Sequence, residues 1–335
     1  MTGRLRVGIV GAGMIAGCHS RAYAASGVEV AAVCDPRRSK ADELAAPTGA
    51  AVVADLDALL DLDVDLVSVC TPPDSHVDLA LQSLAAGRHV LCEKPVARDL
   101  ADARRLRVAA QAAQAAGLVV AVGHVSRFEA DHAAAQRLVA DGSIGRVAMM
   151  SHSLTSSFPA WSEGGWLGDP ARSGGPLLDL AVHSFDYLAW VSGARAVRVS
   201  AVAGDTSAGP DTYALATVRY DNGAMAQVQA SWGNPGSRGF RLTCELVGSE
   251  GRLSWDYGSI TNGELHRSDG PGEVFFPLGE RGYAAEVAAF AAAARTGGPS
   301  PVPVEAGYQA LRTALAARRS LETGQPVDLT TWEVA

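Results

Sequence analysis

Short runs of hydrophobic residues alternate with amphipathic stretches along the first third of the chain. The short runs show no polar alternation, which is typical of parallel strands that are covered on both faces. The amphipathic stretches have helical spacing, and most of them end at a glycine that can cap a helix. This order predicts an α/β doubly wound parallel sheet. The predicted strands are 5–10, 28–34, 65–70, 89–92 and 118–122, and the predicted helices are 14–26, 37–46, 75–86 and 100–116.

After about residue 145 the pattern changes to short strands in which hydrophobic and polar residues alternate in places. Strands are predicted at 197–202, 213–220, 225–232, 242–247 and 252–256, with one helix before them at 177–191 and two after them at 283–294 and 305–323. Hairpin signals such as Asp221-Asn222-Gly223 predict a large, open and mostly antiparallel sheet. We therefore expect an α/β domain over residues 1–124 and an α+β domain over residues 125–335, whose final helix can pack back on the first domain.

The composition and charge are those of a globular protein that does not bind polyanions. Of the 335 residues 48% are hydrophobic and 19% are charged, which excludes a disordered chain. The formal net charge is −8 and no basic cluster offsets it, which argues against nucleic acid and membranes as partners. The five cysteines are scattered without a C-x-x-C spacing, and a strand begins within a few residues of Met1. These features favour a cytoplasmic protein with reduced thiols and no metal.

The first predicted turn carries a dinucleotide-binding pattern. Gly11-Ala12-Gly13-Met14-Ile15-Ala16 fits G-x-G-x-x-A between a strand and a helix, as in the Rossmann fold. Gly11 permits a tight turn, Gly13 lets a pyrophosphate approach the backbone, and the helix N-terminus stabilises the phosphate charge. Because Met14 and Ile15 begin this helix, we count them with Gly11 and Gly13 as cofactor-binding residues.

An aspartate follows this turn at the spacing of a ribose-binding carboxylate. Asp35 ends the second predicted strand about twenty residues later, where it can accept the ribose hydroxyls. Its charge would repel a 2′-phosphate, so NAD is favoured over NADP. Arg37 and Arg38 follow directly and would soften that preference. The alternative is that Asp35 only caps the helix that follows Pro36.

Two further loops follow predicted strands and should reach the same crevice. These are Cys70-Thr71-Pro72-Pro73-Asp74-Ser75-His76 and Cys92-Glu93-Lys94-Pro95. Lys94 is one of only two lysines among 28 basic residues. An ammonium group can donate to a substrate oxygen and can share its proton, whereas a guanidinium keeps its proton. The alternative interpretation is a surface ion pair of Glu93 with Lys94.

A carboxylate and an imidazole share one face of the predicted helix 177–191. Asp179 and His183 are four residues apart, so the carboxylate can hold or polarise the imidazole. A proton acceptor of this kind is what alcohol oxidation requires. Asp186 lies three residues beyond His183 and competes for the same role. Taken alone, such a pair is usually an ordinary helix contact.

These motifs together resemble those of the Gfo/Idh/MocA oxidoreductases, a family of inositol and sugar dehydrogenases. The resemblance covers nearly the whole chain, and E-K-P together with D-x-x-x-H is its most specific part. One departure is G-G-P at residues 174–176, where many members have G-G-G, and this should stiffen the start of the catalytic helix. The matching segments are G-A-G-M-I-A, V-C-D-P, T-P-P-D-S-H, E-K-P, G-H-V-S-R-F, G-G-P-L-L-D-L-A-V-H-S-F-D and E-L-V-G-S-E-G.

The resemblance implies roles for individual residues. Lys94, Asp179 and His183 match the catalytic trio of the family, and the Lys94–Pro95 bond is expected to be cis. The positions that match the nicotinamide pocket are Thr71, Pro72, His76 and Glu93, with Lys94 also facing the cofactor, and Arg37 stays with Asp35 as a cofactor-binding residue. Apart from the resemblance, Arg127, His152 and Trp166 are candidates from the sequence to line the substrate pocket, and the alternative is that they belong to the core or to an interface.

The implied activity is an NAD-dependent dehydrogenase that oxidises a secondary alcohol of a sugar, inositol or related polyol. One alternative is a glycosidase that oxidises and then reduces its substrate again, with no net NADH. Another is a non-catalytic NAD(H)-responsive regulator, which would be expected to lack the trio that this chain retains. The family resemblance also implies a homodimer or homotetramer, formed through the antiparallel sheet.

Overall fold

The chain folds into two compact units. The first comprises Met1–Phe128 and Glu280–Tyr308, and the second comprises Glu129–Gly279 and Gln309–Ala335. A segment near the C-terminus therefore belongs with the first unit, while the domain boundary after residue 124 stays a prediction. The computed structural model describes residues 4–160, 162–206, 208–235, 239–257, 263–267, 273–275 and 282–332.

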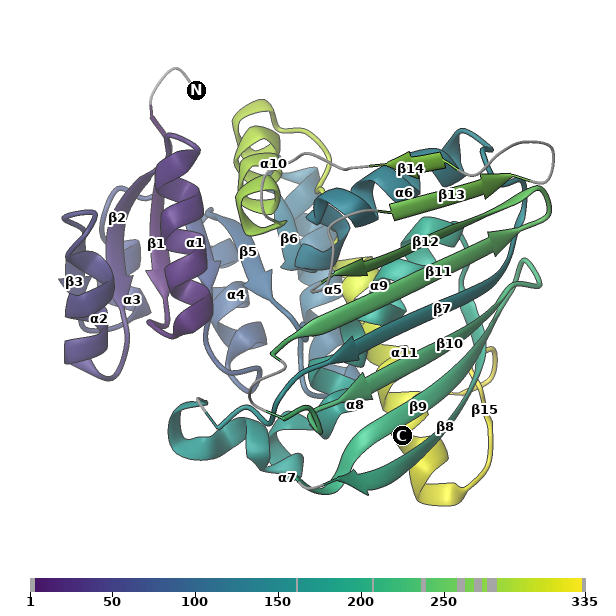
Figure 1. Cartoon of the computed structure of the whole chain (residues 1–335). Helices are drawn as coiled ribbons and strands as arrows, with labels where there is room; N and C mark the ends of the chain where they lie inside the picture. The colour runs from purple at the N-terminus through teal and green to yellow at the C-terminus, as the bar shows by residue number, and fades with distance from the viewer. Residues whose placement is uncertain are drawn as a thin grey trace. The chain divides into compact units, whose positions relative to one another are not determined.

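The first unit contains the predicted parallel sheet (Figure 1). Its six strands run in the order β3-β2-β1-β4-β5-β6, and every pair is parallel. The doubly wound prediction is thus confirmed. The strands are β1 Arg6–Val10, β2 Glu29–Cys34, β3 Ala51–Val53, β4 Leu66–Val69, β5 His89–Glu93 and β6 Val120–Gly123. The helices are α1 Met14–Ala25, α2 Arg38–Ala45, α3 Leu56–Leu60, α4 His76–Ala85, α5 Leu100–Ala115 and α10 Gly282–Thr296.

Strand β3 and helix α3 lie outside the residue ranges that the sequence pattern predicts. They are three and five residues long, which is too short for a hydrophobic period to become visible. A local signal for α3 is nevertheless present, because the Asp55 side chain accepts a hydrogen bond from the Ala58 N–H and caps the helix.

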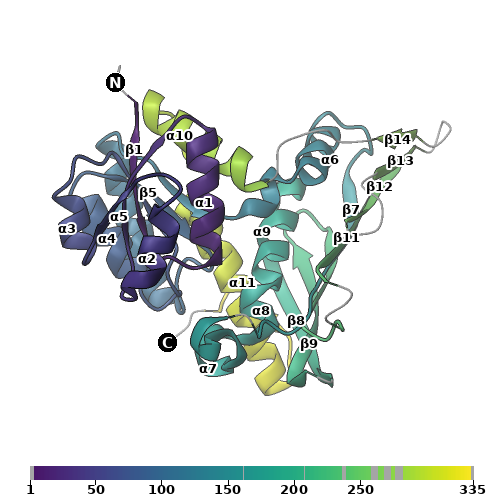
Figure 2. The ribbon, with the colours of Figure 1, turned by 60° about the vertical axis from the view of Figure 1, so that its left-hand side comes forward.

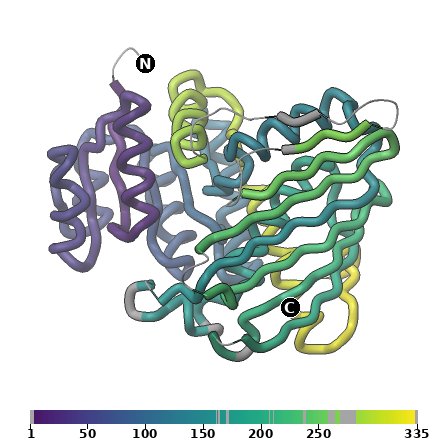
Figure 3. The backbone as a smooth tube through the Cα atoms, viewed as in Figure 1, coloured from purple at the N-terminus to yellow at the C-terminus, as the bar shows by residue number. Residues whose placement is uncertain are grey.

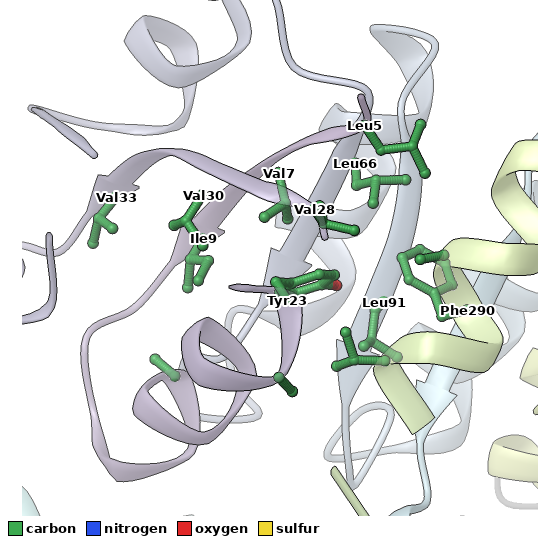
Figure 4. Packing of buried hydrophobic residues seen from close by; sticks show 14 of the residues in the cluster. Leu5, Val7, Ile9, Tyr23, Val28, Val30, Val33, Leu66, Leu91 and Phe290 are labelled. Atoms are coloured by element: carbon green, nitrogen blue, oxygen red, sulfur yellow. The ribbon is translucent and has the colours of Figure 1, made fainter. Parts of the chain in front are cut away.

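The hydrophobic core of the first unit joins residues from both ends of the chain (Figure 4). Ile9 of β1, Tyr23 of α1 and Leu91 of β5 are fully buried in this cluster. Phe290 of α10 is fully buried in the same cluster, although it lies 199 residues after Leu91 in the sequence. Burial of an aromatic side chain contributes roughly 1.5–3 kcal/mol, so α10 is held by the same effect that holds the sheet.

The second unit is built on a nine-stranded sheet in the order β14-β13-β12-β11-β7-β10-β9-β8-β15. All neighbours are antiparallel except β7 and β10, so the prediction of a mostly antiparallel sheet is confirmed. The strands are β7 Val147–Thr155, β8 Ala196–Thr206, β9 Gly209–Tyr220, β10 Met225–Ser231, β11 Arg241–Gly248, β12 Gly251–Tyr257, β13 Gly263–Arg267, β14 Glu273–Phe275 and β15 Val327–Asp328. The helices are α6 Ala130–Ala140, α7 Pro170–Ser173, α8 Gly175–Asp179, α9 Ala181–Ser192 and α11 Val304–Thr323, of which the part from Gln309 onward belongs to this unit.

The two faces of this sheet differ. Figure 2 shows α8 and α9 on one side of the strands, whose continuous paths can be followed in the tube of Figure 3. Val228 and Ala226 of β10 are buried, whereas Met225 of β10 and Met149 of β7 are 46% and 52% exposed. Within the described part of the second unit, no helix covers these methionines. This face is therefore open to solvent or to a partner.

Among the described residues, no helix combines the length and the apolar character that a membrane span requires.

Candidate active site

The carboxyl ends of the parallel strands gather most of the predicted cofactor residues at one edge of the sheet. Strand β1 lies between β2 and β4, and β5 lies between β4 and β6. Each of these strands therefore contributes its following loop to this edge. The gathered residues are Gly11, Gly13, Asp35, Thr71, Pro72, Glu93 and Lys94, and Arg127 follows in the short 3₁₀ helix η1 Val125–Phe128.

The glycine turn after β1 has the shape that a pyrophosphate needs. Gly11 has a φ of 93°, and a Cβ at this position would lie 2.7 Å from the carbonyl oxygen of Cys70. At Gly13, the residue that precedes α1, a Cβ would meet nothing within 4 Å. No acidic side chain lies in the first turn of α1, so its N–H groups and dipole face an approachable space. The residues present thus fit the diphosphate of a dinucleotide.

Two further predicted cofactor residues begin this helix. Met14 is 58% exposed, which is unusual for a large apolar side chain, and Ile15 is half-buried. An exposed methionine beside the turn can contact a bound nucleotide without competing for its phosphates.

Asp35 is ionised and held at the end of β2. Its carboxylate accepts hydrogen bonds from the N–H of Ala12 and from the N–H of Arg37, both at 2.8 Å. Burial raises the pKa of Asp35, but the hydrogen bonds and charge of Arg37 lower it more, so the pKa lies below its ordinary value. The residue that precedes α2 is Arg37, so the alternative that Asp35 acts as the helix cap is wrong.

Arg37 also covers part of this carboxylate. Its guanidinium Nε lies 3.1 Å from Oδ1 and its Nη2 lies 3.3 Å from Oδ2 of Asp35. The Arg37 side chain is 47% exposed, so a ribose hydroxyl can displace it without breaking the two backbone bonds. The same guanidinium would be available to a 2′-phosphate if the carboxylate were removed.

Replacing Asp35 with serine should therefore shift the cofactor preference toward NADP⁺. Loss of the charge beside Arg37 and Arg38 removes the repulsion of the 2′-phosphate, and the ratio of kcat/KM for NADP⁺ to that for NAD⁺ should rise by at least about tenfold. The matched control is Asp102→Ser on α5, where an exposed aspartate pairs with Arg105 and no such shift is expected. A wild-type enzyme that already uses NADP⁺ as well as NAD⁺ would contradict this role of Asp35.

Lys94 follows the last residue of β5 and precedes a cis peptide bond to Pro95, as the family resemblance implied. Glu93 is 5% exposed, so the alternative of a surface Glu93–Lys94 pair is wrong. The Glu93 carboxylate points into the unit, where Oε1 lies 2.9 Å from Nε2 of His19 and Oε2 accepts the Lys94 N–H at 3.1 Å. The contact of Glu93 with the nicotinamide stays a prediction.

His76 joins the two loops that were predicted to line the nicotinamide pocket. It is fully buried, and its Nε2 and Nδ1 lie 2.7 Å from the carbonyl oxygen of Thr71 and 2.9 Å from that of Pro95. Burial lowers the pKa of His76, and its contacts with the two carbonyl oxygens only partly oppose this. Ser75 donates to Thr71 at 2.7 Å and stiffens the first loop further. His76 therefore sets the distance between these loops.

The prediction of one continuous helix over residues 177–191 is wrong, because two helices occupy this range. Helix α8 ends at Asp179 and α9 begins at Ala181, with Leu180 between them. The His183 N–H donates to the Leu180 carbonyl at 3.1 Å, a tighter i to i−3 bond, so Asp179 and His183 belong to two successive helices. Asp179 is half-buried, whereas the competing Asp186 is only 2% exposed.

The other residues predicted to contact the substrate differ in how far their side chains are buried. Trp166, in the 3₁₀ helix η2 Glu163–Gly168, is half-buried in the second unit. Arg127 of the first unit is only 9% exposed. Lys94 lies in the first unit and Asp179 and His183 lie in the second, so their meeting in one site stays a prediction.

His152 belongs to a buried hydrogen-bonded chain that sequence reasoning missed. Its Nε2 lies 3.1 Å from Nε2 of His132, and its Nδ1 lies 2.8 Å from Oγ of Ser184. Nδ1 of His132 lies 3.1 Å from Asp131, and both histidines are fully buried. Since burial and the neighbouring His132 lower the pKa of His152, this residue is a neutral element of the interior and not an exposed lining residue. No local sequence pattern indicates that these side chains form one hydrogen-bonded group.

Comparison with known proteins finds one matching family model in each of the two units. A family model described as "Oxidoreductase family, NAD-binding Rossmann fold" matches residues 5–124, and the "GFO/IDH/MocA C-terminal domain" matches residues 132–254. The chain is 33% identical to the 1,5-anhydro-D-fructose reductase of Ensifer adhaerens over 81% of each protein. It is 29% identical to the inositol 2-dehydrogenase of Rhizobium meliloti (strain 1021), over 97% of this chain and 99% of that protein.

A solved structure with the same architecture is that of GenD2 from gentamicin A biosynthesis, in complex with NAD. It superposes with a TM-score of 0.84 at 29% identity and covers 98% of this chain and 97% of that one. The glycine turn, the ionised Asp35 and the two matched domain models lead to one conclusion: the chain belongs to the Gfo/Idh/MocA family of NAD-binding oxidoreductases.

Proposed function

We propose that this protein is an NAD-dependent dehydrogenase that oxidises a secondary alcohol of a sugar, an inositol or a related polyol to a ketone. The observation that carries the proposal is that Lys94 follows β5 at the same carboxyl edge of the parallel sheet as the glycine turn after β1. Similarity to an inositol 2-dehydrogenase and to a 1,5-anhydro-D-fructose reductase supports the substrate class, since both names describe redox chemistry on polyhydroxylated rings.

The residues have complementary roles in this proposal. A ring nitrogen of His183 takes the proton of the substrate hydroxyl, while the Nζ of Lys94 donates to the same oxygen and stabilises its developing negative charge. Asp179 holds the imidazole or binds the substrate. Gly11, Gly13 and Asp35 would hold the NAD, which supplies a hydride acceptor when bound. Arg127 and Trp166 would contact the substrate.

The test is an NAD⁺-reduction screen across inositols, hexoses, pentoses and anhydrosugars. Stoichiometric NADH formation with at least one polyol is expected. Release of reducing sugar from a glycoside without net NADH would instead establish the redox-assisted glycosidase. NAD binding without turnover of any polyol or glycoside would favour the non-catalytic regulator.

The open face of the nine-stranded sheet is proposed to bind a second copy of this chain. Met149, Met225 and Arg219 lie side by side across β7, β10 and β9, because Met225 pairs with both of the others. They line a groove of about 630 Å³ that also includes Glu245. A two-fold interface would place basic and acidic residues of the same patch against each other and cover the methionines.

Charge introduced into this groove should therefore dissociate the oligomer. In the double variant Met149→Glu and Met225→Glu, like charges would face each other across the two-fold axis, and the dissociation constant should rise by at least about tenfold. Light scattering at micromolar concentration measures the change. Val108→Glu is the control, since Val108 is a 63% exposed hydrophobic residue of α5 in the first unit. A monomeric wild type would contradict the proposal.

A further inference from the structure

A buried polar cluster lies next to Lys94 in the first unit. His19 of α1 places Nδ1 2.7 Å from Oγ of Ser68 on β4 and Nε2 2.9 Å from Oε1 of Glu93 on β5. His19 is fully buried, and Glu93 and Glu286 are 5% and 1% exposed. Both ring nitrogens of His19 thus face oxygen atoms in the interior, an arrangement that costs free energy unless every polar group is satisfied.

The cluster is connected to the Lys94 backbone through one carboxylate. Oε1 of Glu93 lies 2.9 Å from Nε2 of His19, and Oε2 of the same carboxylate accepts a hydrogen bond from the backbone N–H of Lys94 at 3.1 Å. The neighbouring strand leaves room for this carboxylate, because a Cβ at Gly123 would lie 2.7 Å from Oε1 of Glu93. A displacement of the carboxylate would therefore be transmitted directly to Lys94.

Aromatic rings fix the orientation of the imidazole. The ring of Tyr23 meets that of His19 edge-on with centroids 6.3 Å apart, and the ring of Tyr283 lies at 5.7 Å. Titratable groups face the pair from α1, β4, β5 and α10, namely Tyr23, Cys70, Cys92, Lys94, Tyr283 and Glu286, and Cys18 lies next to Tyr283. Burial raises the pKa of both tyrosines above 10, so their hydroxyls stay neutral.

The charges of the two partners support each other. Burial alone would lower the pKa of His19, yet Cys70 and Glu93 raise it well above its ordinary value of 6.5. Burial raises the pKa of Glu93, but His19 and Lys94 lower it below its ordinary value of 4.5. The ion pair contributes its full stabilisation to the fold between pH 4.5 and pH 6.5, the ordinary pKa values of the two groups. Because the folded pKa of His19 is higher and that of Glu93 is lower than these values, part of the stabilisation persists above and below this range. This stability is lost when the pH rises through the folded pKa of His19 or falls through that of Glu93.

We propose that His19 is a positioning residue for Lys94: its protonated imidazole binds the Glu93 carboxylate, and that carboxylate holds the Lys94 amide at the end of β5. The inference rests on the proposed function in one respect, namely that Lys94 acts on the substrate. His19 itself contacts neither substrate nor cofactor in this account and acts only through Glu93.

The same atoms also meet a geometric condition for a metal ion. Ligand atoms of His19, Glu93 and Glu286 lie within 4.8 Å of one another. A proton and a divalent cation would compete for Nε2 of His19, since a metal ligand must be deprotonated. The Glu93 carboxylate 2.9 Å from Nε2 can only accept and therefore favours the proton at that nitrogen, and the experiment includes zinc to decide between them.

The first experiment observes the ring nitrogens of the full-length protein by ¹⁵N-edited NMR, with the His19 signal assigned from its loss in His19→Gln. At about pH 8 an ordinary imidazole is neutral, and we expect both nitrogens of His19 to remain protonated. One bare nitrogen, or a stoichiometric zinc complex at Nε2, would overturn the proposal. This readout needs no substrate, so it stands even if the proposed dehydrogenase activity fails.

The second experiment separates positioning from simple packing. His19→Phe keeps the ring volume but leaves the Glu93 carboxylate without its cation. We expect kcat to fall by about 10- to 100-fold with little change in NAD affinity, because a small misplacement of a catalytic group is sufficient. Without the charge of His19, the burial that raises the pKa of Glu93 is less opposed, so its pKa should rise and the kcat profile should gain an ionisation that disappears in the double variant His19→Phe with Glu93→Gln.

His89→Phe is the matched control, since His89 is buried at the start of the same strand and its Nδ1 accepts the Val119 N–H. It should leave kcat and the pH profile unchanged. An equal effect of His89→Phe, or normal kcat and pH dependence in His19→Phe, would overturn the proposal. If His19→Phe does not fold, His19→Gln replaces it, because glutamine can donate to Glu93 without carrying charge. In a protein without turnover, the shift of the Lys94 amide signal in these variants replaces kcat.

Discussion

Lys94→Arg should lower kcat by about 10²- to 10³-fold, although the variant keeps the positive charge. The Lys94 backbone N–H is held at 3.1 Å by the buried Glu93 carboxylate, so the main chain is anchored at this residue and a longer, planar side chain would place its cation differently. A guanidinium also cannot share its proton with a developing alkoxide at neutral pH. Steady-state kinetics with the polyol found in the screen measure the loss, and NAD titration should give a near-normal affinity.

The only other lysine offers a matched control. Lys40 on α2 pairs with Glu43 at 2.9 Å, three residues later, and lies away from the loops after β4 and β5. Lys40→Arg should retain full activity, since a surface pair of this kind contributes at most about 1 kcal/mol. Near-normal turnover of Lys94→Arg would remove Lys94 from the proposed mechanism.

His183→Asn should lower turnover by about 10²- to 10⁴-fold and remove one limb of the pH profile. An imidazole accepts a proton only when it is neutral, and an unperturbed imidazole titrates at about 6.5. In the wild type, kcat/KM for oxidation should therefore fall as the pH decreases through the ionisation of the base. Asparagine keeps the approximate shape but removes the base, and NAD binding should persist because the glycine turn and Asp35 are untouched.

An exposed histidine of the same unit serves as the control. His266 on β13 is 53% exposed in its side chain and lies 3.3 Å from Glu264, so His266→Asn should change neither turnover nor the pH profile. A His183→Asn variant that kept both turnover and the acidic limb would show that the proton leaves by another route. Lys94 would then be the first residue to test.

The sequence did not predict the break between α8 and α9 or the buried hydrogen-bonded group that contains His152, and the reason is the same for both. The hydrophobic spacing of residues 177–191 continues through Leu180, so it contains no sign that one helix becomes two. The chain of Asp131, His132, His152 and Ser184 joins three elements whose order in space no local spacing encodes. Periodicity reports which side of an element is buried, but it does not report which buried groups meet.

The sequence by itself determined the alternation of strands and helices along the first unit, its doubly wound parallel sheet, the glycine turn and the edge at which Asp35, Glu93 and Lys94 gather, whereas the order of the strands in that sheet came from the structure. These follow from local rules: apolar runs make buried strands, glycine permits the tight turn, and parallel strands end at one edge. Only the tertiary structure decided that the carboxylate of Glu93 turns inward to His19, 74 residues away, and that α10 returns to complete the core of the first unit. Both depend on burial of charge and apolar surface between segments distant in the chain, and such contacts leave no period in the sequence.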